Sequence, residues 1–394
     1  MTSDRFTTFR SHFPGVNDGV FMSVAQRGLM PVQVQDAIAQ HVAKRTGVGW
    51  SKEESFKLVE QTRIAFAELV NAHPNEIAFT KNVSDGLNAI AGSIRWAPGD
   101  NVILCPELEH PANVYPWYNV ARRHGIELRR VPANKGHVDI NGFIEAIDNR
   151  TRLASVSTVT FSPGFVTDVP ALSLVCRERG VRLIVDAAQS VGILHTDVEK
   201  LGVDALTVAT QKGLISCYGM GFLYCRASFA EELKPASLAR FSVDLDEEKH
   251  ETALIGEDFT YAPAARRFDG GNYNYIGVAA VKAALDLLQE LGTPAIEKHV
   301  RSLSDRMARG FLDAGLPLCG GRSGPHLGNI LALGKSGGGR HYTAEDPAMN
   351  KLHKILTEEG VHLAIRKGVL RFSLHAYNNE EEVDQVVEIV GRDQ

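Results

Sequence analysis

The sequence has few cysteines, and their spacing suggests no cross-link. There are five in 394 residues, which is an odd number, and they are widely scattered. Such a pattern provides neither the disulfide framework of a small secreted protein nor the paired spacing of a zinc site. We therefore predict no metal site and expect the protein to work in the reducing cytoplasm. The cysteines are Cys105, Cys176, Cys217, Cys225 and Cys319.

Long apolar runs and a strong excess of one charge are also lacking. The apolar runs fall far short of a membrane span, and Met1–Arg5 does not lead into the apolar core of a signal peptide. A net charge of −5 gives no reason to expect nucleic acid or an anionic membrane as a partner. At this length the chain can form a large α/β domain and a smaller second one.

Two short apolar runs in the middle of the chain organise the rest. Val181–Val185 is interrupted only by Arg182 and is followed by Asp186, whereas Ala205–Ala209 leads into a turn that carries Lys212. Both runs are typical of buried parallel strands. Because the carboxyl ends of parallel strands meet at one edge of a sheet, we expect the carboxylate and the amine to lie close together.

This pair suits pyridoxal phosphate (PLP) chemistry. A lysine can hold the aldehyde as a Schiff base, and a carboxylate can keep the pyridine nitrogen protonated so that the ring accepts electrons. Taken singly, Asp186 would more often be a helix cap and Lys212 a solvated surface charge. The other motifs of the chain favour the catalytic interpretation of both.

The segment D-A-A-Q-S-V-G at 186–192, followed 26 residues after its Asp by the lysine of Q-K-G, resembles the class V aminotransferase family. These are fold-type I PLP-dependent enzymes similar to cysteine desulfurases, and the resemblance covers almost the whole chain. It implies an α/β fold with a large PLP-binding domain at 15–260, built on a mostly parallel seven-stranded sheet. A smaller α+β domain at 261–394 would follow, with residues 1–14 packing against it.

A turn near residue 84 is a candidate phosphate site. Ile77–Thr80 is typical of a strand, and we expect a helix over about Gly86–Ile94 with Ser84 as its cap. Free amides at such a helix start bind anions. The turn resembles the family's phosphate turn, with Asp85 where Glu is usual, and this implies that Val83 and Ser84 bind the cofactor. Alone, it would be an ordinary capped helix.

The resemblance also places residues around the cofactor ring. It implies that His110 stacks on the ring and assists proton transfer, although an ordinary loop histidine is the alternative. Phe161 stands where the family often has Asn, Ser or Thr, so Ser162 or Gln189 would have to contact the phenolic oxygen. Gln211 stands where desulfurase-like members usually have a phosphate-binding His; it can still donate a hydrogen bond but carries no charge.

The segment 267–274 resembles the family motif R-F-E-x-G-T-x-N, with Asn272 in place of Thr. The resemblance implies that Asn272 completes the phosphate site of a partner subunit, and hence a homodimer with shared active sites. Near the end of the predicted large domain, the acidic segment 244–257 is expected to be a solvated face or a mobile connection.

Near the C-terminus, the segment 369–384 resembles the family's R-x-S-x-x-x-Y-N motif. The resemblance implies that Arg371 binds the substrate α-carboxylate, for which a guanidinium is suited. Arg366 is a candidate for the substrate side chain, and Gln26 lies in a segment expected to cover the substrate. Desulfurases carry a reactive cysteine shortly before that arginine, but none occurs between Gly360 and Arg371. Persulfide chemistry is therefore disfavoured.

Together these features favour a PLP-dependent enzyme that acts on an amino acid, with Lys212 moving the α-proton and transamination as the favoured reaction. A carbon–sulfur lyase, an epimerase and a kynureninase-like hydrolase remain open, because fold and cofactor do not choose among them. A non-catalytic PLP-binding protein is the remaining alternative.

Overall fold

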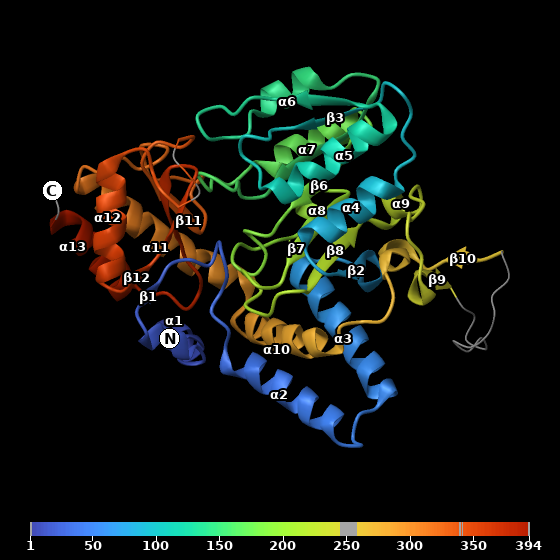
Figure 1. Cartoon of the computed structure of the whole chain (residues 1–394), viewed down its shortest axis with the longest axis horizontal. Coiled ribbons are helices and arrows are strands. Elements are labelled where there is room, and N and C mark those ends of the chain that lie inside the picture. Colours follow the sequence, from blue (N-terminus) through green and yellow to red (C-terminus); the bar gives the residue numbers. More distant parts are fainter. Residues whose placement is uncertain (1, 245–257, 339, 341, 393–394) are drawn as a thin grey trace.

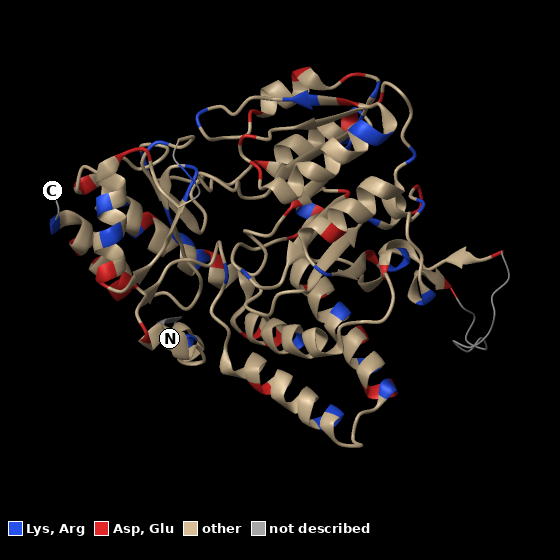
Figure 2. Cartoon of the chain, in the orientation of Figure 1, with Lys and Arg blue, Asp and Glu red and all other residues tan. Residues whose placement is uncertain are grey.

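The computed structural model describes residues 2–244, 258–338, 340 and 342–392 (Figure 1). The acidic segment predicted at 244–257 therefore lies, apart from its first residue, outside the described residues. No helix in the described part combines the length and apolar character that a membrane crossing requires. Figure 2 shows lysine and arginine interspersed with aspartate and glutamate along the helices.

A seven-stranded sheet forms the centre of the molecule, in the order β2-β8-β7-β6-β5-β3-β4. Strand β8 runs antiparallel to both of its neighbours, and all the other pairs are parallel. This confirms the predicted mostly parallel sheet. The strands are β2 (Ile77–Thr80), β3 (Asn101–Leu104), β4 (Glu127–Arg130), β5 (Thr151–Ser157), β6 (Arg182–Asp186), β7 (Ala205–Ala209) and β8 (Gly221–Cys225).

Alternate residues of the central strands enter two hydrophobic clusters, one on each face of the sheet. On β6, Leu183 and Val185 belong to one cluster and Ile184 to the other. The larger cluster includes buried residues of α3 (Lys52–Val70), α7 (Val169–Glu178) and α10 (Tyr275–Leu291), and the smaller includes α4 (Val83–Ser93) and α5 (Tyr115–His124). Burial on both faces explains why these strands read as continuous apolar runs.

A second, smaller sheet lies in the C-terminal part of the chain. It is antiparallel, in the order β11-β14-β13, and consists of β11 (Ile330–Leu333), β13 (Ala364–Arg366) and β14 (Val369–Ser373). Two residues near the N-terminus, β1 (Val20–Phe21), pair in parallel with β12 (Val361–His362). The segment around residue 20 thus lies beside the C-terminal part of the chain, and Figure 1 shows β1 next to β12. Helix α10 packs on α2 and α3. The predicted domain boundaries, 15–260 and 261–394, stay a prediction.

The remaining α-helices and strands lie outside these two sheets. They are α1 (Thr2–Ser11), α2 (Val32–Thr46), α6 (Ile140–Ala146), α8 (Val198–Leu201), α9 (Ala227–Ala230), α11 (Thr293–Asp313), α12 (Pro347–Glu358), α13 (Glu380–Arg392), β9 (Val243–Asp244) and β10 (Thr260–Tyr261). Strands β9 and β10 pair with each other and are antiparallel.

Candidate active site

Asp186 and Lys212 lie at the carboxyl ends of two neighbouring parallel strands, as predicted. Asp186 is the last residue of β6 and pairs with Thr207 of β7, five residues before Lys212. The carboxylate of Asp186 is buried and accepts a hydrogen bond of 2.9 Å from Ala188 N. Burial raises the pKa of Asp186, while the charge of Lys212 acts in the opposite direction. The site therefore holds a desolvated carboxylate within electrostatic reach of an amine.

The amine of Lys212 has no hydrogen-bond or ion-pair partner among the described residues. Burial lowers its pKa to about 8; the Asp186 carboxylate partly opposes this shift, and the Arg371 guanidinium adds to it. A lysine with this pKa is partly neutral near neutral pH, and only the neutral amine is a nucleophile or a base. Lys212 is thus suited to attack an aldehyde.

Two glycines, Gly192 and Gly213, allow the turn after Asp186 to contact the turn that carries Lys212. Gly192 has a φ of +88°, and a Cβ there would lie 2.2 Å from Gly213 O. A Cβ on Gly213 would lie 2.3 Å from Val191 O. The turn after Asp186 and the turn that carries Lys212 are therefore in direct backbone contact, at a distance that only glycine permits.

His375 fixes the lysine turn from the other side. Its ring is fully buried, and burial lowers its pKa to about 4, so the ring is neutral. Because Nδ1 accepts a hydrogen bond from Ala376 N at 2.7 Å, Nε2 carries the proton and donates to Gly213 O at 2.9 Å. This role could not be predicted from the sequence, since a histidine within the segment 369–384 gives no sign of a contact 162 residues away in the chain.

His110 lies beside the same group of charges. Partial burial lowers its pKa to about 4, and the charges of Lys212 and Arg371 contribute to the shift. The neutral ring accepts a hydrogen bond from Ala112 N on Nδ1, which leaves the proton on Nε2. It packs edge-on against Phe161, with the ring centres 5.0 Å apart.

Glu109 is a second residue that sequence analysis missed. It is 2% exposed, and its carboxylate accepts hydrogen bonds from Ser157 N at 2.7 Å, from the Ser157 hydroxyl and from Asn113 Nδ2 at 2.9 Å. Burial raises its pKa to about 7. These contacts tie the loop of His110 to the end of β5. No local pattern reveals them, because the partner strand lies 48 residues away.

The phosphate turn differs in detail from the prediction. Helix α4 begins at Val83 rather than near Gly86, and Asn82 is its cap instead of Ser84, because Asn82 Oδ1 accepts a hydrogen bond from Asp85 N at 3.0 Å. Ser84 lies in the first turn. The side chain of Val83 is buried, so only its backbone can face a ligand.

Ser84 and His110 line one cavity of about 400 Å³. The cavity lies at the amino end of α4, a helix of 11 residues whose first amides have no partner within the helix. The arrangement can accept an anionic group next to a flat ring. This is the combination that the phosphate and the pyridine ring of PLP require.

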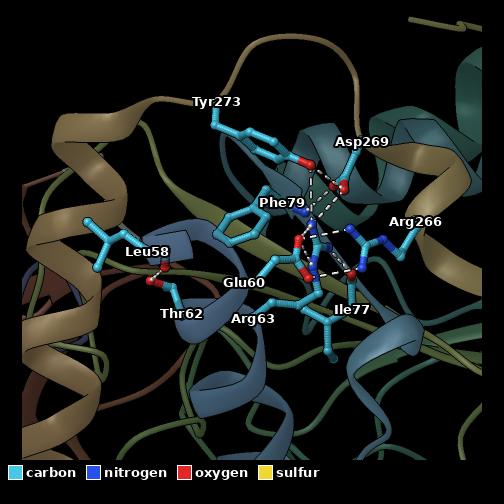
Figure 3. A network of polar contacts seen from close by, with 9 residues as sticks. All are labelled: Leu58, Glu60, Thr62, Arg63, Ile77, Phe79, Arg266, Asp269 and Tyr273. Atoms are coloured by element: carbon cyan, nitrogen blue, oxygen red, sulfur yellow. Dashed lines mark hydrogen bonds and ion pairs between the residues drawn. The ribbon is translucent and has the colours of Figure 1, made fainter. Parts of the chain in front are cut away.

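The loop that carries Asn272 is held by a network of polar contacts (Figure 3). The Asp269 carboxylate accepts hydrogen bonds from Arg63 at 2.8 Å, from Phe79 N at 2.9 Å and from the Tyr273 hydroxyl at 2.9 Å. Arg63 and Asp269 are both almost completely buried. The network fixes the loop against β2, next to α4.

Asn272 itself is exposed and lines a cavity of about 370 Å³ together with Thr80 and Asp85. Asn88 lines both this cavity and the one with His110 and Ser84. Asn272 therefore lies near the phosphate turn of its own chain. Its role toward a partner subunit stays a prediction.

Arg371 is a buried cation without a counter-ion in the described part of the chain. It is 1% exposed, donates one hydrogen bond of 2.8 Å to Phe161 O, and leaves its Nε without a partner. Burial lowers its pKa to about 9, and Arg366 contributes to the shift. A desolvated guanidinium with a free donor needs an anion.

The other predicted residues are placed as follows. Arg366 is 9% exposed and donates to Ile365 O at 2.7 Å. Gln189 is buried and donates to Ala25 O at 3.1 Å, Ser162 is buried, Gln211 is partly buried, and Gln26 is exposed. Among the described residues, no side-chain hydrogen bond joins these glutamines to Asp186, Lys212 or Arg371, so their contacts with a cofactor or substrate stay predictions.

The five cysteines all lie in the described part, and none is paired. Burial raises the pKa of every one of these thiols; it reaches about 11 for Cys105 and Cys319, and about 12 for Cys176. None is a low-pKa thiolate of the kind that acts as a nucleophile.

The donor set fits PLP. A partly neutral lysine lies beside a buried carboxylate, a neutral histidine and free helix amides share one cavity, and a guanidinium with an orphaned Nε lies close by. These are the groups that an aldehyde, a pyridinium nitrogen, a phosphate and a substrate carboxylate each require.

Comparison with known proteins identifies the family. A family model described as aminotransferase class V matches residues 30–386, so the chain belongs to this family. A probable cysteine desulfurase of Methanothermobacter thermautotrophicus is 30% identical over 95% of this chain and 94% of its own length. An uncharacterized aminotransferase, YcbU, of Bacillus subtilis is 28% identical over 96% of each chain.

The fold agrees with this assignment. The apo structure of a cysteine desulfurase from Thermococcus onnurineus superposes with a TM-score of 0.85 at 23% identity, covering 98% of this chain and 97% of the other. The protein is a fold-type I, PLP-dependent enzyme, as the resemblance implied.

Proposed function

We propose that the protein acts on an α-amino acid and that its reaction is transamination. The observation that carries this proposal is Arg371, a buried guanidinium whose Nε has no partner and which forms no ion pair within the described residues. Its charge makes a carboxylate the expected ligand, and it is close enough to Lys212 to influence the pKa of that amine. A carboxylate anchor near a reactive amine suits an α-amino acid.

When bound, PLP supplies an aldehyde for the amino group and an electron sink for the charge that develops at the substrate Cα. Asp186 would hold the protonated ring nitrogen, and the amides at the start of α4 with Ser84 would hold the phosphate. Nζ of Lys212 would take the proton from Cα, because its lowered pKa leaves part of the amine unprotonated. His110, neutral with a proton on Nε2, would cover the ring face.

Carbon–sulfur bond cleavage is the second candidate, favoured by the relatives named as probable cysteine desulfurases. The thiols of this chain oppose a desulfurase that passes sulfur through its own cysteine, because burial raises all five pKa values. A lyase that releases the sulfur compound directly needs no such thiol. It would use the same lysine and arginine.

A panel of L-amino acids distinguishes the two reactions. The purified holoenzyme is mixed with each amino acid without a keto-acid acceptor, and pyridoxamine phosphate, pyruvate and sulfide are measured. Transamination predicts stoichiometric pyridoxamine phosphate that returns to PLP when a keto acid is added. Catalytic pyruvate with sulfide or persulfide would establish the lyase instead. Failure of every amino acid to yield any of these products would refute both.

We also propose a homodimer in which Asn272 contributes to the neighbouring phosphate site. The position of Asn272, exposed on a rigid loop next to α4, supports this arrangement. Light scattering of the holoenzyme should give twice the mass of the 43.0 kDa chain, and a fully active monomer would contradict the proposal. The cytoplasmic location stays a prediction.

A further inference from the structure

Two buried arginines lie on one face of the small sheet. In the antiparallel pair formed by β13 and β14, Ala364 is opposite Arg371 and Arg366 is opposite Val369. Opposed residues share a face, so Arg366 and Arg371 are diagonal neighbours, which in such a pair are about 7–8 Å apart. The alternate residues, Ile365 and Leu370, belong to the hydrophobic core on the other face.

This face is turned toward the active site. Arg371 bonds to Phe161 O, and the Phe161 ring also lies 5.0 Å from the ring of His110. Arg366 acts electrostatically on both Arg371 and His110. The two guanidiniums and the histidine therefore belong to one group of neighbouring side chains.

The positive charge of this face is not balanced by the described residues. Arg366 and Arg371 are 9% and 1% exposed, and neither forms an ion pair with an aspartate or glutamate in the described ranges. Within these ranges, each guanidinium donates a hydrogen bond to a backbone carbonyl, at 2.7 Å from Arg366 and at 2.8 Å from Arg371. Two like charges in a poorly solvated site are costly unless anions join them.

An α-carboxylate accounts for only one of the two charges. On the proposed function, Arg371 takes that carboxylate, and Arg366 is left as a buried cation beside the bound substrate. The Tyr342 ring lies 5.5 Å from the Arg366 guanidinium and covers it on one side, without adding a negative charge. Arg366 therefore requires a second anionic group on the same ligand.

We propose that the substrate is a dicarboxylic amino acid, with its α-carboxylate on Arg371 and its side-chain carboxylate on Arg366. The inference rests on the proposed action on amino acids and adds the class of side chain. An amide or an alkyl side chain of equal length would leave Arg366 without a counter-ion. Removing one partner of a buried charged pair costs at least about 30-fold in affinity.

A binding experiment tests the pair of arginines without any reaction. Glutarate and succinate contain two carboxylates and no amine, and butyrate contains one carboxylate. By calorimetry on the holoenzyme, we expect the better of the two dicarboxylates to bind at least about 30-fold more tightly than butyrate. Arg366→Gln should reduce this preference to within about threefold, whereas Arg366→Lys, which keeps the charge, should retain part of it.

Lys57→Gln is the matched control, because it removes one positive charge from an exposed residue of α3 that lines neither of the two cavities described above. It should leave the preference for dicarboxylates unchanged. Equal affinity of the parent protein for butyrate and both dicarboxylates would overturn the inference. An equal loss of preference in the Lys57→Gln variant would overturn it too, since net charge alone would then explain the effect.

Turnover separates this inference from the proposed function. The parent enzyme should prefer aspartate, glutamate or 2-aminoadipate over asparagine, glutamine and leucine in kcat/KM, and Arg366→Gln should lower the values for acidic substrates only. Reaction with neutral amino acids at equal or higher kcat/KM would overturn the inference while the proposed function stands. An equal loss for all substrates in Arg366→Gln would assign Arg366 a structural role and overturn it as well.

Discussion

The guanidinium of Arg371 donates a hydrogen bond of 2.8 Å to Phe161 O and lies 5.1 Å from the centre of the Phe161 ring. The same ring lies 5.8 Å from the amine of Lys367 and contacts His110 edge-on. Phe161 stands where the family often has a small polar residue. Its ring and carbonyl therefore position the cations of Arg371 and Lys367. The Phe161 side chain has no polar group and so cannot form the hydrogen bond to the cofactor that a small polar residue could form there.

Arg371→Ala should weaken amino-acid binding while leaving PLP bound. The expected loss is about 2–5 kcal/mol, because the variant removes the partner of a buried carboxylate. Arg371→Lys should recover only part of the loss, since an ammonium cannot offer two parallel hydrogen bonds. Titration of the holoenzyme with a substrate amino acid, followed by absorbance, measures the effect. An amine without a carboxylate serves as the control and should bind all three proteins alike.

Asp186→Asn should preserve the fold and the bound cofactor but reduce turnover at least several-hundred-fold. An amide does not hold the ring nitrogen in its protonated form, and the electron sink then fails when charge develops at Cα. Steady-state rates together with the absorbance of bound PLP test this expectation. Near-parental turnover would show that the essential carboxylate is another residue, with Glu109 the nearest buried alternative.

The contact between Asp269 and Arg63 should contribute strongly to stability. Asp269→Ala leaves Arg63, which has no exposed side-chain surface, without its buried partner, and we expect a loss of about 3–5 kcal/mol in the free energy of unfolding. Glu60→Ala is the matched control. Glu60 lies 3.4 Å from the same guanidinium and also pairs with Arg266 at 2.8 Å, but both of these contacts are partly exposed to solvent, so its loss should be about 1–2 kcal/mol, less than that of Asp269. Urea unfolding of both variants measures the difference, and equal losses would contradict the assignment.

The pKa of Lys212 should be measurable in the protein without PLP. Since its pKa is lowered to about 8, the reactivity of the amine should be half-maximal near pH 8 and should approach its plateau above that value. The Asp186 carboxylate raises this pKa and Arg371 lowers it, so Asp186→Asn should shift the midpoint down and Arg371→Ala should shift it up. Competitive acetylation followed by peptide mass spectrometry gives the midpoint, with the exposed Lys335 as an internal reference. Shifts in the opposite sense would contradict the arrangement of charges.

Much of the fold could be predicted because local signals sufficed. The bounds of β2 (Ile77–Thr80) and β7 (Ala205–Ala209) match the prediction, since a short, largely apolar run marks each of these strands. The start of α4 could not be predicted correctly, because Asn82 and Ser84 are both good caps. Only the folded backbone, extended at Asn82, decides between them.

The rest of the site depends on contacts between distant parts of the chain. Arg63 and Asp269 are 206 residues apart, and His375 reaches Gly213 across 162 residues. Neither contact leaves a pattern within a single element. The face that Arg366 and Arg371 share follows from the register of β13 and β14, which requires the turn between these strands to be known.

The position of the Schiff base is tested most directly by locating the cofactor on the chain. The holoenzyme is reduced with borohydride, digested, and mapped by mass spectrometry. We expect one pyridoxyl group, on Nζ of Lys212. A pyridoxyl group on Lys200, Lys234 or any other lysine, or none at all in a protein that contains bound PLP, would contradict this assignment.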